Sequence, residues 1–443
     1  MRRNFSRRNL LKGAAAGAAA TFAAPYILRA APLGVQKLRI AFVGTDGQAG
    51  AHTGLAKDES CPCYADVDPG RQGKIASLAP QAKAYTDWRE MMDKHEKEID
   101  AVIVTTPDHT HFPATMRAMM AGKHAYTEKP LTWSIPEARA LANITKEKKL
   151  ATQMGNMGHN SGQNCMTIEY VQAGAIGDIT EIHSTTGRPS WPQGPGALNA
   201  KLGNPGNVNW DVWCGAGPVR EYSPDIHPFK WRGWVDYGCG AVGDMGCHTW
   251  DAPFNAMEPD YPTMVELIEV EGVGRGVFPG RTHFMWTFPA KGKRPAFKAH
   301  WYSGGMQPKL PDGAPKIGGS GSLYIGTKGF LLCQGDYGGT PTIYPDTLRK
   351  EFKAPPQTVR RSNHKGDWLA ACKGQKPFDF PLSNFMNGGP LTEVLLLGAM
   401  VERFGEKGGK IECNAEKREV TTKAALDIMN RVPRKGFDFL PKV

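Results

Sequence analysis

Lys129 is the residue of this sequence whose type and setting best suit proton transfer at a hydroxyl group. It stands in the tripeptide Glu128-Lys129-Pro130, directly after an apolar segment typical of a buried strand. An ammonium group there can hydrogen-bond a substrate hydroxyl, and burial would lower the pKa of Lys129 and ease proton transfer. We also predict a cis bond between Lys129 and Pro130, because a cis proline in a tight turn would aim the lysine inward.

Asp244 and His248 form the second candidate group. They lie in the segment from Gly240 to Asp251, for which we predict a helix that continues to Met257. Residues four apart share a helix face, so His248 can carry a hydroxyl proton while Asp244 orients the substrate or tunes the histidine. The alternative is a capping aspartate and a histidine buried in the core. No third ligand accompanies the pair, and the nine cysteines lack zinc-site spacing, so no metal is predicted.

A glycine-rich turn at residues 44–50 follows a segment at 38–43 that predicts a buried strand. Such a turn lets the backbone approach a pyrophosphate. Asp46 stands where the dinucleotide motif has its middle glycine, and a carboxylate there should repel phosphate unless it points away. Asp66, about twenty residues further on, can accept hydrogen bonds from an adenine ribose and disfavours the extra phosphate of NADP. We therefore predict NAD, with NADP less favoured, bound through Gly44, Asp46, Gly47, Gln48, Ala49 and Asp66.

Strand-like and helix-like segments alternate through the first part of the chain. A strand at 101–105 leads into a polar turn, a helix at 113–121 follows, and a further strand is expected at 151–154. This alternation predicts a doubly wound parallel sheet, which binds ligands beyond the carboxyl ends of its strands. Further cofactor contacts are therefore predicted at Thr106, Pro107, His111, Glu128, Lys129 and Asn156. The alternative is an α/β domain that binds no nucleotide.

Two motifs in this region resemble those of a known family. The segment Asp100–His111, and the run 121–124 followed by Glu128-Lys129-Pro130, are similar to signatures of the Gfo/Idh/MocA (glucose–fructose oxidoreductase/inositol dehydrogenase) family. The resemblance runs from about residue 38 to about residue 439 and is most specific in the first half. It implies a Rossmann domain at 36–158 and a second α/β domain at 159–443, whose open, mostly antiparallel sheet covers the nicotinamide.

The resemblance also carries expectations about the site and the assembly. It implies that Lys129, Asp244 and His248 line the substrate pocket. It further implies that the open face of the second sheet pairs between subunits, which gives a homo-oligomer, either a dimer or a tetramer.

Residues 188–237 are dense in tryptophan, glycine and proline. Aromatic faces stack on the apolar faces of sugar rings, so this segment could form a carbohydrate platform. The alternative, at least as strong, is that the tryptophans pin a long loop onto the domain. The substrate contacts predicted from the whole sequence are Lys129, Arg188, Trp191, Asp244 and His248.

The net charge of +11 depends on the first 31 residues, which hold six basic residues and no acid and leave +5 for the rest. No later basic run is interleaved with aromatic residues, so nucleic-acid binding is not expected. The pair Arg7-Arg8 precedes a short alanine-rich segment, which indicates a twin-arginine signal peptide at 1–31 and a periplasmic mature protein. That segment is too weak to hold a membrane. The alternative is a basic tail that is disordered or amphipathic.

An exported dehydrogenase that released NADH could not readily recover it, so we expect a cofactor bound tightly and recycled within one active site. The main hypothesis is an NAD(P)-dependent oxidoreductase acting on a hydroxyl of a small sugar or polyol. The alternative is a redox-neutral NAD-dependent glycoside hydrolase, which oxidises a sugar, eliminates a substituent through a keto-sugar and returns the hydride. A third hypothesis, an exported binding protein with structural NAD, is disfavoured because it needs no proton relay.

Overall fold

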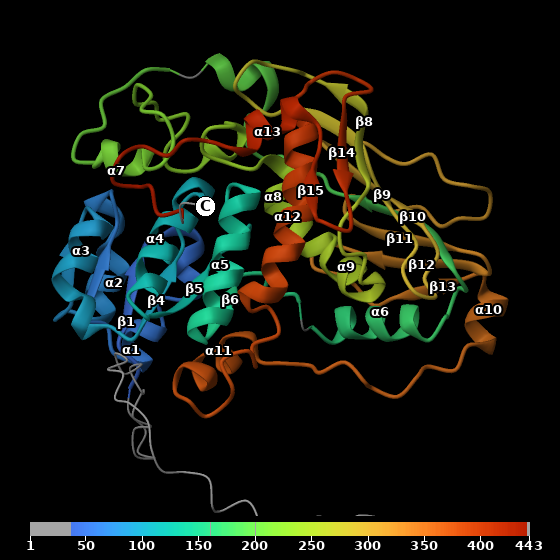
Figure 1. Ribbon diagram of the computed structural model, residues 1–443, viewed down its shortest axis with the longest axis horizontal. Helices are drawn as coiled ribbons and strands as arrows, with labels where there is room; N and C mark the ends of the chain where they lie inside the picture. The colour runs from blue at the N-terminus through green and yellow to red at the C-terminus, as the bar shows by residue number, and fades with distance from the viewer. Residues whose placement is uncertain (1–36, 160, 200, 441–443) are drawn as a thin grey trace, which may run out of the picture. The chain divides into compact units, whose positions relative to one another are not determined.

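The computed structural model describes residues 37–159, 161–199 and 201–440. The predicted signal peptide at 1–31 lies outside the described residues. The first sheet has six parallel strands in the order β3-β2-β1-β4-β5-β6 (Figure 1). They are β1 (Ile40–Val43), β2 (Cys63–Ala65), β3 (Lys83–Tyr85), β4 (Ala101–Val104), β5 (His124–Thr127) and β6 (Thr152–Met154).

The central strands of this sheet are buried on both faces, and their sequences are continuous apolar runs. Every residue of β1 and β4 is buried, as parallel strands between two layers of helices require. The flanking helices are α1 (Leu55–Asp58), α2 (Gly73–Leu78), α3 (Trp88–His95), α4 (Asp108–Met120) and α5 (Ile135–Lys148). Ser134 and Glu137 form a capping box that starts α5 next to the Lys129 turn.

The second sheet has nine strands in the order β13-β12-β11-β7-β10-β9-β8-β14-β15. β7 pairs with β10 in parallel and the other pairs are antiparallel, so the predicted fold class is confirmed. The strands are β7 (Ile179–Thr185), β8 (Met264–Glu271), β9 (Arg281–Phe288), β10 (Phe297–Ser303), β11 (Gly321–Gly326), β12 (Gly329–Gln334), β13 (Thr342–Tyr344), β14 (Lys410–Asn414) and β15 (Glu419–Val420).

Helices cover one face of the second sheet. α12 (Phe385–Glu402) contacts β8 and β9 on one side and α5 of the first domain on another (Figure 1). The single helix predicted from Gly240 to Met257 is two helices, α8 (Gly240–Thr249) and α9 (Asp251–Met257), which meet at Trp250. Pro253 lies in the first turn of α9, where proline is tolerated. The interior of one continuous helix would not tolerate it, which explains the break. The remaining helices are α6 (Gly162–Gln172), α7 (Trp210–Cys214), α10 (Asp346–Glu351), α11 (His364–Cys372) and α13 (Lys423–Met429).

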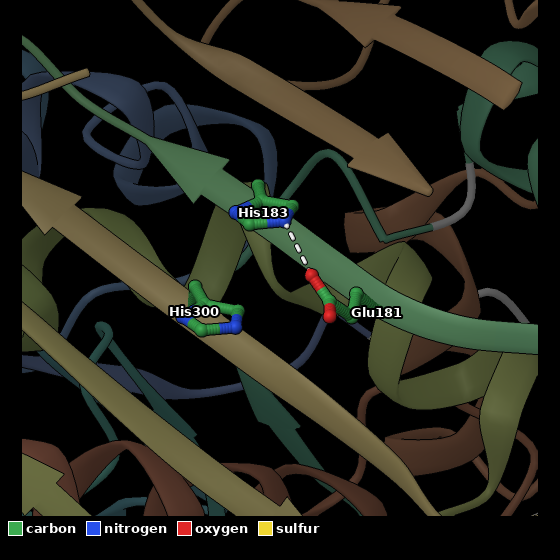
Figure 2. Close-up of side chains that lie close together, drawn as sticks. All are labelled: Glu181, His183 and His300. Atoms are coloured by element: carbon green, nitrogen blue, oxygen red, sulfur yellow. Dashed lines mark hydrogen bonds and ion pairs between the residues drawn. The ribbon is translucent and has the colours of Figure 1, made fainter. Parts of the chain in front are cut away.

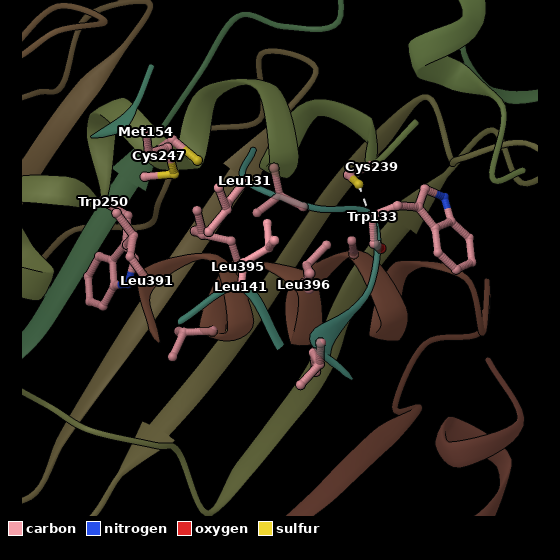
Figure 3. Close-up of a cluster of buried hydrophobic side chains, with 14 of the residues drawn as sticks. Leu131, Trp133, Leu141, Met154, Cys239, Cys247, Trp250, Leu391, Leu395 and Leu396 are labelled. Atoms are coloured by element: carbon pink, nitrogen blue, oxygen red, sulfur yellow. Dashed lines mark hydrogen bonds between the residues drawn. The ribbon is translucent and has the colours of Figure 1, made fainter. Parts of the chain in front are cut away.

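One apolar core joins the first domain to α8 and α12 (Figure 3). Leu131 and Met154 come from the first domain, Cys247 from α8 and Leu395 from α12, and all four are fully buried. Burying each such side chain stabilises the fold by roughly 1.5–3 kcal/mol. At Gly246 a Cβ atom would lie 2.5 Å from Leu395 Cδ2, so α8 and α12 approach too closely for a larger residue. This packing fixes the position of α8 against the first sheet.

Later parts of the chain return to the first domain. Trp368 of α11 is fully buried and packs edge-on against Tyr126 of β5, with ring centroids 5.6 Å apart. Phe437 packs against Trp88 of α3. Among the described residues, no helix combines the length and the hydropathy needed to cross a bilayer.

Candidate dinucleotide-binding active site

A cavity of about 390 Å³ opens beyond the carboxyl ends of β1, β2, β4 and β5. It lies where the strand order reverses between β1 and β4, the place where doubly wound sheets bind ligands. Ten of the predicted cofactor residues line it together: Gly44, Asp46, Gly47, Gln48, Asp66, Thr106, Pro107, His111, Glu128 and Lys129.

The glycine-rich turn has a conformation that only glycine adopts readily. Gly44 has a φ of 87°, and a Cβ atom there would lie 2.8 Å from the carbonyl oxygen of Thr105. Gly47 has a φ of 62°, and the nearest atom to its Cβ position is Arg71 Nη2 at 3.8 Å, so the turn is open on that side. Asp46 does not present a bare carboxylate, because Arg71 Nη2 lies 2.9 Å from its Oδ2. The ion pair explains how an acid is tolerated beside a phosphate-binding turn.

Asp66 is held in place by the turn that follows β1. Its Oδ2 accepts hydrogen bonds from the backbone amide and the hydroxyl of Thr45, at 2.9 and 3.1 Å, and its Oδ1 accepts one from the amide of Asp68. Burial raises the pKa of Asp66 although these hydrogen bonds oppose the shift. Oδ1 keeps a further lone pair, so the group can accept a hydrogen bond from a ribose hydroxyl at the cavity wall. The open turn and this oriented acid together fit a dinucleotide.

Glu128 lies deeper, at the end of β5. Its Oε1 is 2.8 Å from His52 Nε2 and 3.5 Å from Gln48 Nε2, which donates to it. Burial favours the neutral acid, but His52 outweighs it and lowers the pKa of Glu128. At Gly155 a Cβ atom would approach the Glu128 carboxyl to 2.5 Å, so this glycine leaves room for the acid. No spacing or motif in the sequence indicated that His52 would contact Glu128.

Lys129 and Asp244 come together from the two domains. Lys129 Nζ lies 2.7 Å from Asp244 Oδ1 and also donates to the Asp244 carbonyl oxygen at 3.1 Å. The side chains are only 13% and 12% exposed. The Lys129-Pro130 bond is cis, as predicted. His111, a predicted cofactor contact, hydrogen-bonds the carbonyl oxygens of Thr106 and Pro130, and so ties this turn to the end of β4.

The expected lowering of the Lys129 pKa is wrong. Burial by itself would lower the pKa of Lys129. The nearby Asp244 carboxylate outweighs burial, so the pKa of Lys129 is raised. Burial by itself would raise the pKa of Asp244. The charges of Lys129 and Arg232 outweigh burial and lower the Asp244 pKa to about 2. Arg232 Nε lies 3.5 Å from Asp244 Oδ1. Lys129 is therefore a charged hydrogen-bond donor in this arrangement.

His248 lies one turn further along α8 and does not line the cavity. Its Nδ1 is buried and has no hydrogen-bond partner among the described residues, and its ring packs against Tyr337 with centroids 4.6 Å apart. Burial lowers the His248 pKa to about 3, with a smaller contribution from the Lys129 charge. The ring is therefore neutral at neutral pH. Tyr337 lies on an exposed loop between β12 and β13, and no motif in the sequence pointed to it.

Besides Asp244 and His248, four further predicted residues lie outside the cavity wall. Ala49 is buried inside the short helical turn 47–51. Asn156 donates to Asp251 Oδ1 at 3.2 Å, in a buried network with His159. Arg188 donates to Ser190 Oγ at 2.9 Å. Trp191 is 4% exposed, so its ring does not offer the open face predicted for a sugar.

The tryptophan-rich segment forms a small core of its own that contacts the first domain. Trp213, Trp231, Trp234 and Tyr237 pack together in it. The amide of Asn209 donates to the Val67 carbonyl oxygen at 2.7 Å, which fastens the segment beyond β2. The same segment supplies part of the cavity wall. Two of its wall residues, Trp213 and Trp231, belong to the tryptophans that the sequence pointed out, and the others were not singled out: Val212, His227, Pro228, Phe229 and Arg232.

This arrangement of turn, acid and cavity agrees with comparisons to known proteins. Residues 38–156 match the model of an oxidoreductase family with an NAD-binding Rossmann fold, and residues 185–271 match the model of its C-terminal α/β domain. The chain belongs to the Gfo/Idh/MocA family. The first domain of this Gfo/Idh/MocA protein is an NAD-binding Rossmann domain, which confirms the predicted cofactor.

Curated relatives of this Gfo/Idh/MocA protein include enzymes named for two chemistries. Levoglucosan dehydrogenase of Pseudarthrobacter phenanthrenivorans is 27% identical over 189 residues, which cover 42% of this chain and 40% of the relative. Glycosyl hydrolase family 109 protein 1 of Akkermansia muciniphila is 28% identical over 209 residues, with 42% of each chain covered. The chain thus spans about two-fifths of the length of these relatives.

Solved structures share the fold of this Gfo/Idh/MocA protein over most of its length. The WlbA dehydrogenase from Bordetella pertussis, in complex with NADH and UDP-GlcNAcA, has a TM-score of 0.58 at 15% identity. The match covers 86% of this chain and 99% of that one.

Replacing Asp66 by Asn should weaken NAD binding at least about 10-fold, because a charged acceptor of ribose hydroxyls is lost. NADP binding should fall less, since the carboxylate no longer repels its extra phosphate. Quenching of tryptophan fluorescence on titration with each dinucleotide, after removal of bound cofactor, measures both affinities. Asp68→Asn is the control, because Asp68 caps Gly70 in the same turn without lining the cavity. An unchanged NAD affinity in Asp66→Asn would contradict the assignment.

The Lys129–Asp244 pair should make the free energy of unfolding depend on pH in the acid range. The Asp244 pKa is about 2 in the folded protein against an ordinary 3.8, so its stabilisation is present above pH 4 and lost as the pH falls towards 2. Between pH 5 and pH 3, the free energy of unfolding of the wild type should fall by about 1 kcal/mol more than that of Asp244→Asn. Urea unfolding at the two pH values measures this, with the exposed Asp312→Asn as control. Parallel losses in wild type and Asp244→Asn would show that the pair does not act this way.

Proposed function

We propose that this protein oxidises a hydroxyl group of a small sugar or polyol, with NAD as the hydride acceptor. The observation that carries the proposal is the Lys129–Asp244 pair beside the dinucleotide cavity, with the unpartnered Nδ1 of neutral His248 one helical turn away. A binding protein has no need of a buried, charged donor aligned with a free imidazole. The levoglucosan dehydrogenase relative supports a carbohydrate substrate.

Each of the three side chains has a distinct part in this proposal. Lys129, held charged by Asp244, donates a hydrogen bond to the substrate hydroxyl and stabilises the negative charge that develops on its oxygen. His248 takes up the hydroxyl proton through its neutral ring, which requires that bound substrate and cofactor raise its pKa from about 3. Asp244 keeps Lys129 in position, and Arg232 beside it keeps Asp244 ionised. NAD held in the cavity would supply the hydride acceptor for this oxidation.

We also propose that the cofactor is retained and recycled within the site. The cavity wall includes Trp213, Phe229 and Trp231 of the tryptophan-rich segment, facing the first domain. A dinucleotide in the cleft would leave only if this fastened segment moved, which slows its release. Retention suits a protein exported through a twin-arginine signal to the periplasm, where a second carbonyl substrate would reoxidise the cofactor.

Redox-neutral glycoside cleavage is the second candidate. The glycosyl hydrolase family 109 relative favours it. In this reaction, transient oxidation of a sugar hydroxyl to a ketone acidifies the neighbouring C–H bond. A base removes that proton and the substituent leaves, water adds to the double bond that this elimination creates, and the ketone is then reduced by the hydride held on the cofactor. Lys129 and His248 would serve this sequence in the same positions.

Replacing Lys129 by Met, or His248 by Gln, should lower kcat by about 10²–10⁴-fold on any sugar that the wild type turns over. The NAD content of both purified variants should stay at the wild-type level, because neither substitution alters the turn or Asp66. Steady-state turnover, with the dinucleotide released by denaturation quantified in parallel, measures both quantities. Lys123→Met is the matched control, since Lys123 directly precedes β5, at the opposite end from Lys129. Turnover that survives in both variants would overturn the catalytic assignment.

A further inference from the structure

Three potential metal ligands meet on the second sheet, on the face opposite to its helices (Figure 2). Glu181 and His183 are two residues apart on β7, so their side chains project from the same face. His300 lies on the neighbouring strand β10 and is the register partner of His183. One ligand atom from each residue lies within 4.8 Å of the others. None of the three lines the dinucleotide cavity.

We infer that Glu181, His183 and His300 bind a divalent transition-metal ion, with zinc as the best match. Two imidazoles and one carboxylate are a donor set that zinc takes in proteins, with a fourth position left for water. Glu181 Oε2 and His183 Nε2 are 3.2 Å apart. This spacing is close to the ~3.3 Å edge of a tetrahedron with bonds of about 2.0 Å.

Both imidazoles are already oriented by partners outside the ligand set. His183 Nδ1 lies 3.1 Å from the hydroxyl of Tyr302, and His300 Nδ1 lies 3.0 Å from His283 Nε2. Histidines that bind metals use their second ring nitrogen in this way, which fixes the ring and the tautomer. The rings of His183 and His300 are stacked, 6° from parallel with centroids 4.6 Å apart, so binding of one ion would require the rings to tilt until both Nε2 lone pairs point at it.

The local environment suits a cation that enters from solvent. His183 is 4% exposed, whereas the Glu181 side chain is 42% exposed and forms the open side of the cluster. The Glu181 carboxylate supplies negative charge that offsets the ion's charge.

Spacing along the chain could not reveal this cluster. Metal motifs are recognised by ligands a few residues apart, whereas His300 joins the other two only through the pairing of β10 with β7. We predicted no metal from the sequence, where only Asp244, His248 and the cysteines were weighed as ligands, so this inference departs from that prediction.

Cobalt binding tests the inference directly. The purified full-length mature protein, freed of metal with a chelator, should bind one Co²⁺ and develop the intense visible absorption of a four-coordinate ion, which Zn²⁺ then displaces. Glu181→Gln and His300→Gln should each weaken Co²⁺ binding at least about 100-fold and abolish that absorption. His283→Asn, which removes a partner of a ligand, should weaken binding by about 10-fold.

His95→Gln is the matched control, because His95 also lies against a carboxylate, with its Nδ1 3.0 Å from Glu98 Oε2, at another surface of the protein. It should bind Co²⁺ as the wild type does. Circular dichroism and NAD content confirm that each variant is folded, and Glu181→Gln changes a half-exposed side chain. The inference fails if Co²⁺ produces no such absorption, or if binding is the same in Glu181→Gln and His300→Gln as in the wild type.

Discussion

The geometry of the cleft depends on the buried ion pair between Lys129 and Asp244. The lysine follows β5 of the first domain and the aspartate lies on α8, so the pair joins the cofactor-binding sheet to the second domain. Removing one partner of a buried pair typically costs about 3–5 kcal/mol, because the other charge is left unpaired. Arg232 adds a second positive charge, which keeps Asp244 ionised.

Packing must hold α8 within hydrogen-bonding distance of the first sheet for this pair to exist. The contact of Gly246 with Leu395 and the apolar core shared with Leu131 and Met154 supply that constraint. The tryptophan-rich segment is held by the same packed elements. His109 of α4 donates to the Tyr237 carbonyl oxygen through its backbone amide and to the Trp213 carbonyl oxygen through its ring. The elements that would enclose the dinucleotide and the elements that carry the proton relay are therefore parts of one packed unit.

Local patterns were enough to predict the first domain and to select residues that line one cavity. The apolar strands, the turn at Gly44 and the acid at Asp66 each have a cause in neighbouring residues, and the cavity brings them together. The sequence could not give the contacts made across the fold. Arg71 neutralises Asp46, His52 offsets the burial of Glu128, and the Asp244 carboxylate reverses the expected pKa shift of Lys129. Trp191 was misjudged because composition does not reveal which faces of a ring are covered.

Two measurements on the purified mature protein together test the account most directly. The first is mass spectrometry of the dinucleotide released by denaturing the protein. The second is absorbance in the NADH band when sugars are added without free NAD. The account predicts one NAD per chain and a lasting NADH signal with a suitable sugar or polyol. Sugar turnover with bound NAD but no lasting NADH would favour glycoside cleavage instead. A protein that carries no dinucleotide, and takes up none when NAD is supplied, would contradict the account of the whole cleft.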